Sequence, residues 1–279
     1  MVKFEIKPSP LLLISKGDIQ NSIRVTDIPK SLLLEIWNNL SFKQKQNTKF
    51  KRYFKYQLDN PPLSLVLRFH PLSEKKITYI KGHGMSKKVK IPNFLDQDLA
   101  YILGAIRDGG IHFDKKNIAY KIHFAQKNKE YLEIEIIPRL KRLFEITGTL
   151  SLRKDKVYQI QFASKPIYLL FSEVFGMKEI QQFWNTPKIV KNSPKMLKKI
   201  YIRGFYDAEG SKDHLYHSWY KEDECPPLQF ISNILNNEFN IKTTNPLRIK
   251  TNNEFNRYPA YQLFINNYEK FKMEILGIR

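Results

Sequence analysis

Two short stretches share one design: a helix with small residues on one face that ends at an acidic residue. The later stretch is residues 199–210, where Gly204 and Ala208 stand four positions apart and Glu209 comes directly before Gly210. Positions four apart share a helix face, and small residues there let another helix approach closely. A helix C-terminus carries partial negative charge, so an acid there is unfavourable unless a cation offsets it. A bound divalent metal would supply that cation.

An earlier stretch, residues 99–110, repeats the design with Ala100 and Gly104 on one face and Asp108 near its end. It has one residue fewer between the glycine and the acid, and a one-residue slip at the helix end would restore the match. Helices packed through these glycines would bring Asp108 and Glu209 together. We therefore expect these two residues to bind the metal together.

Local signals mark the ends of both helices. Ser193 followed by Pro194 predicts an N-cap and a first helical position for the later helix. Asp96 or Asp98 can cap the earlier one. Gly210 is expected to supply a left-handed turn at the C-terminal end of the later helix.

The composition favours a globular protein that binds a polyanion. The chain has 279 residues, is 42% hydrophobic and carries a formal net charge of +20. Such a charge attracts nucleic acid, with a membrane surface as the competing partner. We expect no membrane partner, because no apolar run reaches the roughly 18 residues of a transmembrane helix. The single cysteine, Cys225, excludes an internal disulfide, and we expect an intracellular, cytoplasmic protein.

Hydrophobic patterning predicts an α+β fold in two repeats, residues 93–190 and 191–279, each read as αββαββα. The other elements expected in the first repeat are hairpin strands and helices, at residues 111–113, 120–125, 130–144, 150–153, 157–162 and 166–175. Pro138 is expected to kink the helix that contains it. In the second repeat, residues 211–221 are short for two strands.

Residues 1–92 repeat nothing later and form a basic N-terminal extension of mixed α/β structure. The elements expected there are strands at 2–6, 11–15 and 63–69 and a helix at 30–40. Residues 43–55 combine lysines with aromatic residues. They are either a solvated basic helix with an aromatic core face or part of an accessory DNA-binding module whose lysines meet phosphate.

The stretches ending in Asp108 and Glu209 resemble the signature helices of the LAGLIDADG homing endonucleases, over residues 93–279. The resemblance implies a monomer in which two four-stranded, saddle-shaped antiparallel sheets cover double-stranded DNA. It also implies site-specific double-strand cleavage with Mg²⁺, for which Mn²⁺ can substitute. Members are usually encoded in introns or inteins. Since no splicing frame is evident, we expect an intron-encoded or free-standing nuclease.

The same resemblance implies that Asp108 and Glu209 are catalytic, and it implies two further catalytic residues. Gln126, after the second strand, would position water, and Lys165, before the closing helix, would stabilise developing negative charge. The alternative for Lys165 is a solvated lysine at a helix start. Lys221 and Asn267 stand near the equivalent places of the second repeat. Asp207 is a weaker candidate.

Polar residues on the strands are the candidates for reading DNA bases. They are His112, Lys121, His123, Arg153, Gln159, Gln161, Arg248, Lys250, Arg257 and Gln262. Gln159 and Gln161 are two apart and share a strand face, which leaves Ile160 and Phe162 for the core. Arginine and lysine suit guanine, whereas glutamine suits adenine.

The alternative function is a catalytically inactive nucleic-acid binder of the same fold, either a transcription regulator or an RNA-splicing maturase with RNA as its partner. A zinc site is disfavoured, because His214 and His217 have no third ligand near them. Metal dependence separates the two functions: a nuclease needs a divalent metal to cut, whereas a binder holds its target without one.

Overall fold

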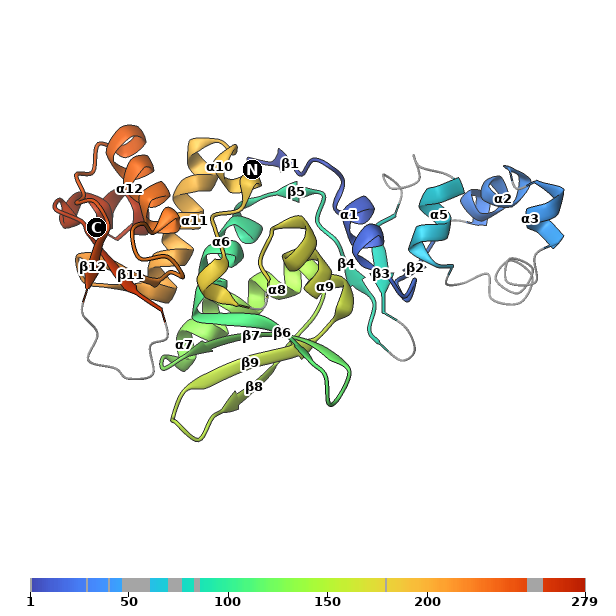
Figure 1. The fold of residues 1–279 in the computed structure, drawn as a ribbon, viewed down its shortest axis with the longest axis horizontal. Coiled ribbons are helices and arrows are strands. Elements are labelled where there is room, and N and C mark those ends of the chain that lie inside the picture. Colours follow the sequence, from blue (N-terminus) through green and yellow to red (C-terminus); the bar gives the residue numbers. More distant parts are fainter. Residues whose placement is uncertain are drawn as a thin grey trace.

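A computed structural model describes residues 2–28, 30–39, 41–46, 61–69, 77–82, 86–178, 180–249 and 258–278. Figure 1 shows three parts: an N-terminal segment (β1 to β5), a first repeat (α6 to η4) and a second repeat (α11 to η6). The first repeat lies between the other two. It packs on the second repeat through α6 and α11, and on the N-terminal segment through η4 and α1.

The first repeat begins with a helix whose last turn is a 3-10 turn, and its other elements follow in the predicted order. They are α6 (Gln97–Ala105), η2 (Ile106–Asp108), β6 (Gly109–Asp114), β7 (Ala119–Gln126), α7 (Lys129–Tyr131), η3 (Leu132–Ile136), α8 (Ile137–Phe144), β8 (Thr149–Leu152), β9 (Tyr158–Ala163), α9 (Lys165–Leu169) and η4 (Leu170–Val174). Pro138 has no N–H to donate, and a π-helical turn, η3, precedes it within an otherwise continuous helix. The expected irregularity is therefore present.

The second repeat has the same order of elements after a short connector. The connector holds η5 (Gln181–Phe183) and α10 (Lys188–Lys191). The repeat itself consists of α11 (Lys195–Glu209), β10 (Gly210–Ser211), β11 (His214–Ser218), α12 (Pro226–Phe239), β12 (Leu247–Ile249), β13 (Ala260–Phe264), α13 (Tyr268–Phe271) and η6 (Lys272–Leu276). Residues 210–218 are thus long enough for two strands, β10 and β11.

The two antiparallel sheets have matching strand orders, β6-β7-β9-β8 and β10-β11-β13-β12. In each, the second and fourth strands of the repeat form the centre, and the first and third form the edges. The duplicated α+β fold predicted from the sequence is therefore confirmed.

The N-terminal segment forms its own small sheet and helices. Its elements are β1 (Phe4–Glu5), α1 (Pro10–Gly17), β2 (Arg24–Thr26), α2 (Lys30–Asn39), α3 (Phe42–Gln46), α5 (Leu63–Phe69), β3 (Tyr79–Lys81), β4 (Val89–Lys90) and β5 (Phe94–Leu95). Strands β2, β3 and β4 form one sheet, and β1 pairs with β5 just before α6. Of the basic stretch 43–55, residues 47–55 lie outside the described ranges.

Two strands predicted in this segment are helices. Residues 11–15 belong to α1, where Leu11 and Ile14 are buried three positions apart. Residues 63–69 form α5, whose buried Leu63, Val66 and Leu67 have helical spacing. Both runs are so short and apolar that a strand and a helix can each bury them, and contacts with the rest of the fold decide between the two.

The helix-end predictions were right at one of three places. Asp96 caps α6, because its Oδ1 accepts a hydrogen bond of 2.9 Å from the Leu99 N–H. Ser193 is not an N-cap: its hydroxyl donates to the Val190 carbonyl at 2.8 Å, and Pro194 takes the cap position of α11 without a side-chain bond. Gly210 has φ −93° and begins strand β10 directly, so it makes no left-handed turn.

Helices α6 and α11 lie side by side in the middle of the molecule and touch through their glycines (Figure 1). A Cβ on Gly104 would lie 2.3 Å from the Tyr201 carbonyl oxygen. A Cβ on Gly204 would lie 2.3 Å from the Tyr101 carbonyl oxygen. Since real Cβ atoms do not approach an oxygen so closely, both positions require glycine, and the helices are held backbone to backbone.

Candidate active site

The two candidate carboxylates hold equivalent places in their repeats. Asp108 ends the 3-10 turn η2 and Glu209 ends α11, and each comes directly before the first residue of a strand, Gly109 or Gly210. A 3-10 helix rises about 2.0 Å per residue and an α-helix about 1.5 Å. The four steps from Gly104 to Asp108, which end in a 3-10 turn, therefore span nearly the same length as the five α-helical steps from Gly204 to Glu209. The turn compensates for the residue that the first stretch lacks.

Electrostatics places the two acids near each other in a partly dehydrated site. Burial raises the pKa of Asp108 to about 7. Burial, and then the charge of Asp108, raises the pKa of Glu209 to about 8, against the opposing effect of the Arg107 guanidinium. Two carboxylates this close together offer the oxygen ligands and the negative charge that a divalent cation prefers. The donor set therefore fits Mg²⁺ or Mn²⁺.

The Gln126 side chain reaches the same end of the helix pair. The Gln126 amide, at the last residue of β7, donates to the Asp207 carbonyl oxygen at 3.5 Å, and its own oxygen accepts from the Lys127 N–H at 3.0 Å. The first sheet thus reaches across to the last turn of α11. Gln126 therefore lies beside the last turn of α11, the turn that ends at Glu209.

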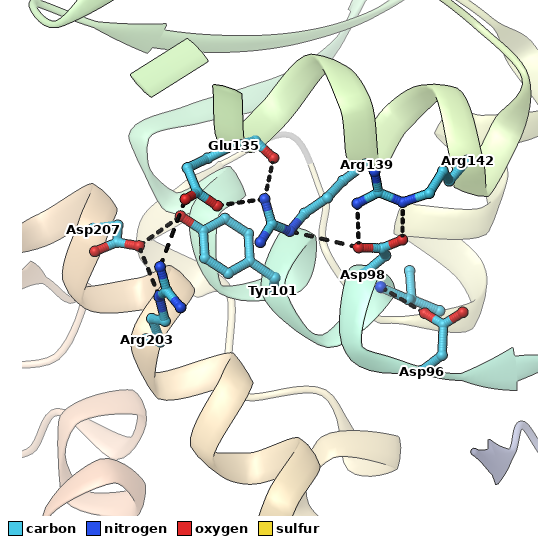
Figure 2. Close-up of polar contacts among 9 residues, drawn as sticks. Asp96, Asp98, Tyr101, Glu135, Arg139, Arg142, Arg203 and Asp207 are labelled. Carbon is cyan, nitrogen blue, oxygen red and sulfur yellow. Dashed lines mark hydrogen bonds and ion pairs between the residues drawn. The ribbon is translucent and has the colours of Figure 1, made fainter. Parts of the chain in front are cut away.

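Asp207 is a structural residue in the contact between the helices rather than a free acid. The Tyr101 hydroxyl of α6 donates to its carboxylate at 2.6 Å, and Arg203 lies 3.8 Å from the same oxygen. Figure 2 shows this pair joined through Glu135 to Arg139. Burial raises the pKa of Asp207, and the Tyr101 hydrogen bond acts against that rise.

The network continues along α8 to the start of α6. Arg142 donates two hydrogen bonds, of 2.7 and 2.8 Å, to Asp98, and Arg139 lies 3.6 Å from the same carboxylate (Figure 2). The Arg139 guanidinium also lies 3.9 Å from the centre of the Tyr101 ring. Asp98, one of the two candidate caps, therefore ties α6 to α8, while Asp96 does the capping.

Replacement of Tyr101 by phenylalanine tests this network. We expect Tyr101→Phe to lower the free energy of unfolding by about 1.5 kcal/mol, because the partly buried Asp207 carboxylate loses its hydrogen-bond donor. Urea unfolding near neutral pH measures the change. Tyr158→Phe is the control, since the Tyr158 hydroxyl makes no hydrogen bond within the described ranges. Equal stability of the two variants would contradict the role given to Tyr101.

The sequence predicts that Lys165 stands free beside the carboxylates, but in the structure its charge is already paired. Its ammonium group donates to Asp18 Oδ1 and to the Ser22 hydroxyl, both at 2.6 Å, and little of either charged side chain is exposed. Asp18 also accepts from the Ile23 N–H at 2.6 Å. Lys165 therefore holds the N-terminal segment against α9. In this arrangement it has no free charge for a phosphate.

This buried ion pair should contribute strongly to stability. Asp18→Ala leaves the Lys165 ammonium without its carboxylate, and breaking one side of a buried pair costs about 3 kcal/mol. The control is Asp155→Ala, which removes the half-exposed 2.9 Å pair with Arg153 and should cost less than about 1 kcal/mol. Urea unfolding followed by circular dichroism compares the two. A loss in Asp18→Ala no larger than in the control would refute the docking role.

The register of the first sheet gathers the predicted base-reading residues on one face. His112 lies opposite Lys121, and His123 lies opposite Gln161. Directly opposed residues share a face, and the next ones on that face are two positions away, so Gln159 joins them. Arg153 lies just beyond β8 at the same hairpin and pairs with Asp155. The other face holds the core.

The predicted core residues of this sheet are buried. Ile160 and Phe162 are buried with Ile122 and Phe124 of the neighbouring strand. The polar face is thus turned away from the helices and is open to a ligand. Lys121 is already paired with Asp114 at 2.6 Å, and this contact holds the pKa of that carboxyl below its usual range.

The second sheet separates its candidates. Gln262 lies opposite Tyr216, whereas Arg248 lies opposite the buried Tyr261 and pairs with Glu222 at 3.3 Å. Gln262 and Arg248 therefore lie on different faces of the sheet. Gln262 lies on the face equivalent to the polar face of the first sheet, and Arg248 does not. Lys250 and Arg257 lie outside the described residues.

The two remaining counterparts in the second repeat serve local structure. Lys221 forms an exposed 3.0 Å ion pair with Glu224, and its carbonyl accepts from the Tyr261 hydroxyl. The Asn267 side chain caps α13 by accepting from the Lys270 N–H at 3.2 Å.

One buried residue beside the acids has contacts that the sequence did not predict. Arg107 is 1% exposed and contacts the connector and His217 of β11 rather than Asp108. Its partners are far away in the sequence. The only local signal was its place directly before Asp108, which suggests an ion pair or a phosphate contact instead.

Within the described part of the chain, no set of three histidine, cysteine or acidic side chains surrounds a common point, and no helix is long and apolar enough to cross a membrane. His214 and His217 lie on strand β11, three positions apart and so on opposite faces. A zinc site formed by these two histidines is therefore ruled out.

Comparison with known proteins gives one curated sequence relative and several solved structures. The homing endonuclease I-ApeI of Aeropyrum pernix is 32% identical over 117 residues, which cover 40% of this chain and 52% of the relative. The chain thus matches about half the length of that relative. No protein-family model matches the chain.

Structures of the homing endonuclease I-DmoI resemble the fold. A structure of its mesophilic variants has a TM-score of 0.50 at 20% identity, covering 66% of this chain and 98% of that one. A structure of I-DmoI in complex with DNA and Mn has a TM-score of 0.49 at 19% identity, covering 66% of this chain and 99% of that one. The chain therefore shares the fold of I-DmoI and, over 117 residues, is similar in sequence to the homing endonuclease I-ApeI.

Proposed function

We propose that the protein is a monomeric, site-specific endonuclease that cleaves both strands of DNA with Mg²⁺, or with Mn²⁺ in its place. The observation that supports this most directly is the reciprocal packing of Gly104 and Gly204, which puts Asp108 and Glu209 at the same end of two paired helices. The matched sequence relative is named a homing endonuclease, and one structure of similar fold holds DNA and Mn.

Asp108 and Glu209 would hold the metal, since both are carboxylates at the start of a sheet and between the two repeats. When bound between these two residues, a divalent cation would supply the Lewis-acid chemistry that lowers the pKa of water and neutralises charge on the leaving oxygen of a phosphodiester. The Gln126 amide, held beside the last turn of α11, would orient a water molecule by hydrogen bonding. The raised pKa values of the acids mean that binding the metal displaces protons.

The open faces of the two sheets would lie on the DNA. In the first repeat this face carries His112, Lys121, His123, Gln159 and Gln161, which offer both donors and acceptors to base edges. Arg153 and, in the second sheet, Gln262 extend the set. A net charge of +20 supplies the general attraction to phosphate.

We propose the division into residues 1–92, 93–190 and 191–279 on the order of the elements. The N-terminal segment would act as an accessory DNA-binding module. Its strong basic charge supports this, as does its attachment to the first repeat through Asp18 and Lys165.

Cleavage of a randomised double-stranded DNA library with Mg²⁺ tests the function. We expect the protein to cut at discrete positions and Glu209→Gln and Asp108→Asn to lose this activity. Asp223→Asn, which removes an exposed acid in the loop between β11 and α12, should cut like the wild type. The proposal fails if the wild type does not cut with Mg²⁺ or Mn²⁺, or if both site variants still cut. Tight binding without cutting would instead indicate an inactive DNA binder.

A further inference from the structure

Arg107 is a fully buried charge that pairs with no carboxylate within the described ranges. Its guanidinium donates to the Trp184 carbonyl at 2.8 Å and to the Asn185 carbonyl at 3.2 Å, and it lies 3.1 Å from His217 Nε2. The rings of Trp184 and Phe205 flank it at 6.0 and 5.6 Å. A buried charge is costly, and so many directed contacts indicate that its place is tightly defined.

The backbone of the same residue is held by the same connector. The Gln181 side-chain amide, in η5, donates to the Arg107 carbonyl oxygen. Residues 181–185 therefore contact Arg107 in two ways, through its carbonyl and through its guanidinium. Since Asp108 follows directly, these contacts fix the orientation of the peptide that leads into the carboxylate.

The two repeats differ at this point. Helix α11 continues as an α-helix to Glu209, and the Gly210 N–H closes its last turn on the Tyr206 carbonyl. In the first repeat the last turn is the 3-10 turn η2, whose hydrogen-bond geometry is poorer and which leaves carbonyls to be satisfied from outside. The Gln181 contact satisfies one of those carbonyls. The connector thus supports the weaker of the two helix ends.

We propose that Gln181 and the Arg107 side chain are positioning residues that hold the η2 turn, and with it Asp108, in the geometry needed to share a metal with Glu209. The inference rests on the proposed function. It assigns to the connector between the repeats a part in forming the site, in addition to joining the two repeats. Neither residue needs to contact DNA or metal itself.

The test compares Gln181→Met with Gln182→Met. Methionine has nearly the length of glutamine but no N–H donor. The Gln182 side chain makes no hydrogen bond in the described part of the chain, so its replacement is a matched control. Mn²⁺ affinity is measured by electron paramagnetic resonance of free Mn²⁺. The kcat and KM values are measured on a DNA target recovered from the library, and the thermal midpoint is measured without metal.

We expect Gln181→Met to weaken Mn²⁺ binding about 10-fold and to lower kcat about 10-fold, as for other residues that orient metal ligands. The KM and the thermal midpoint should match those of Gln182→Met. Arg107→Lys, which keeps the charge but not the planar fork, should lower kcat further, by about 100-fold. If Arg107→Lys does not fold, Gln181→Met alone decides.

Wild-type Mn²⁺ affinity and kcat in Gln181→Met would overturn the inference and leave the nuclease function intact. A lower thermal midpoint with both values unchanged would also overturn it, because the contact would then serve stability alone. If the wild type cuts no DNA, the proposed function fails. The Mn²⁺ affinity of Gln181→Met relative to Gln182→Met then still decides whether the connector positions Asp108.

Discussion

Glu209→Gln should make the metal-free protein more stable above neutral pH, although it removes the proposed activity. Burial raises the pKa of Glu209 from its ordinary 4.5 to about 8 in the folded state. Between pH 4.5 and about pH 8, the Glu209 carboxyl is ionised in the unfolded chain and protonated in the folded protein, so folding takes up a proton. Wild-type stability therefore falls as the pH rises through this window, and the full cost remains above it.

The glutamine variant does not carry this cost. We expect its free energy of unfolding to exceed that of the wild type by about 2 kcal/mol near pH 9, and the difference to vanish near pH 4. Asp108→Asn should likewise be more stable than the wild type at high pH, and here the pH window ends at about 7, the raised pKa of Asp108. Urea unfolding at a series of pH values, with EDTA present, measures both.

Added Mg²⁺ should stabilise the wild type and leave both variants nearly unchanged, because a ligand that binds only the folded state shifts the equilibrium towards it. Asp223→Asn is the control and should follow the wild type at every pH and metal concentration. A Glu209→Gln variant that is less stable than the wild type near pH 9 would show that the carboxylate has a structural partner.

Gly204→Ala should be among the most damaging single substitutions in the protein. The new Cβ would lie 2.3 Å from the Tyr101 carbonyl oxygen and 3.2 Å from the Ala105 nitrogen, both in the backbone of the facing helix. No side-chain rotation can relieve such contacts, so the helices must separate. We expect a loss of about 3 kcal/mol or more, against a gain of about 1 kcal/mol from helix propensity.

Asn237→Ala on the exposed side of α12 is the control, because the Asn237 side chain makes no hydrogen bond within the described ranges and alanine has the higher helix propensity; this variant should be neutral or slightly stabilising. Thermal unfolding compares the two variants. Gly104→Ala should behave like Gly204→Ala, since its Cβ would meet the Tyr201 carbonyl at the same distance. An unchanged midpoint for either glycine variant would refute the close helix contact.

The sequence predicts best those features that depend on neighbouring residues. The glycine face of α11, the hairpin of β6 and β7, and the buried pair Ile160 and Phe162 follow from spacing along the chain, and the structure confirms them. The 3-10 turn before Asp108 has a local cause as well, since the missing residue must be compensated within the turn.

Features that depend on partners distant in the sequence could not be predicted. Lys165 looks like a free lysine at a helix start until Asp18, 147 positions earlier, is placed against it. The partners of Arg107 are equally remote, because Trp184 comes from the connector and His217 from the second repeat. A helix such as α5 and a strand bury the same short apolar run equally well, so only tertiary packing distinguishes them.

The contact between Gly104 and Gly204 relates the two repeats as an approximate two-fold axis would. Each glycine faces the carbonyl of the tyrosine that stands three positions before the other glycine, Tyr201 in one direction and Tyr101 in the reverse direction. Contacts of this reciprocal kind are isologous, as in symmetric homodimers. Either repeat therefore presents a surface that could pair with a second copy of itself. The connector joins the two repeats in one chain and so determines which two surfaces pair. The two repeats can then differ in sequence at every position that does not form this contact.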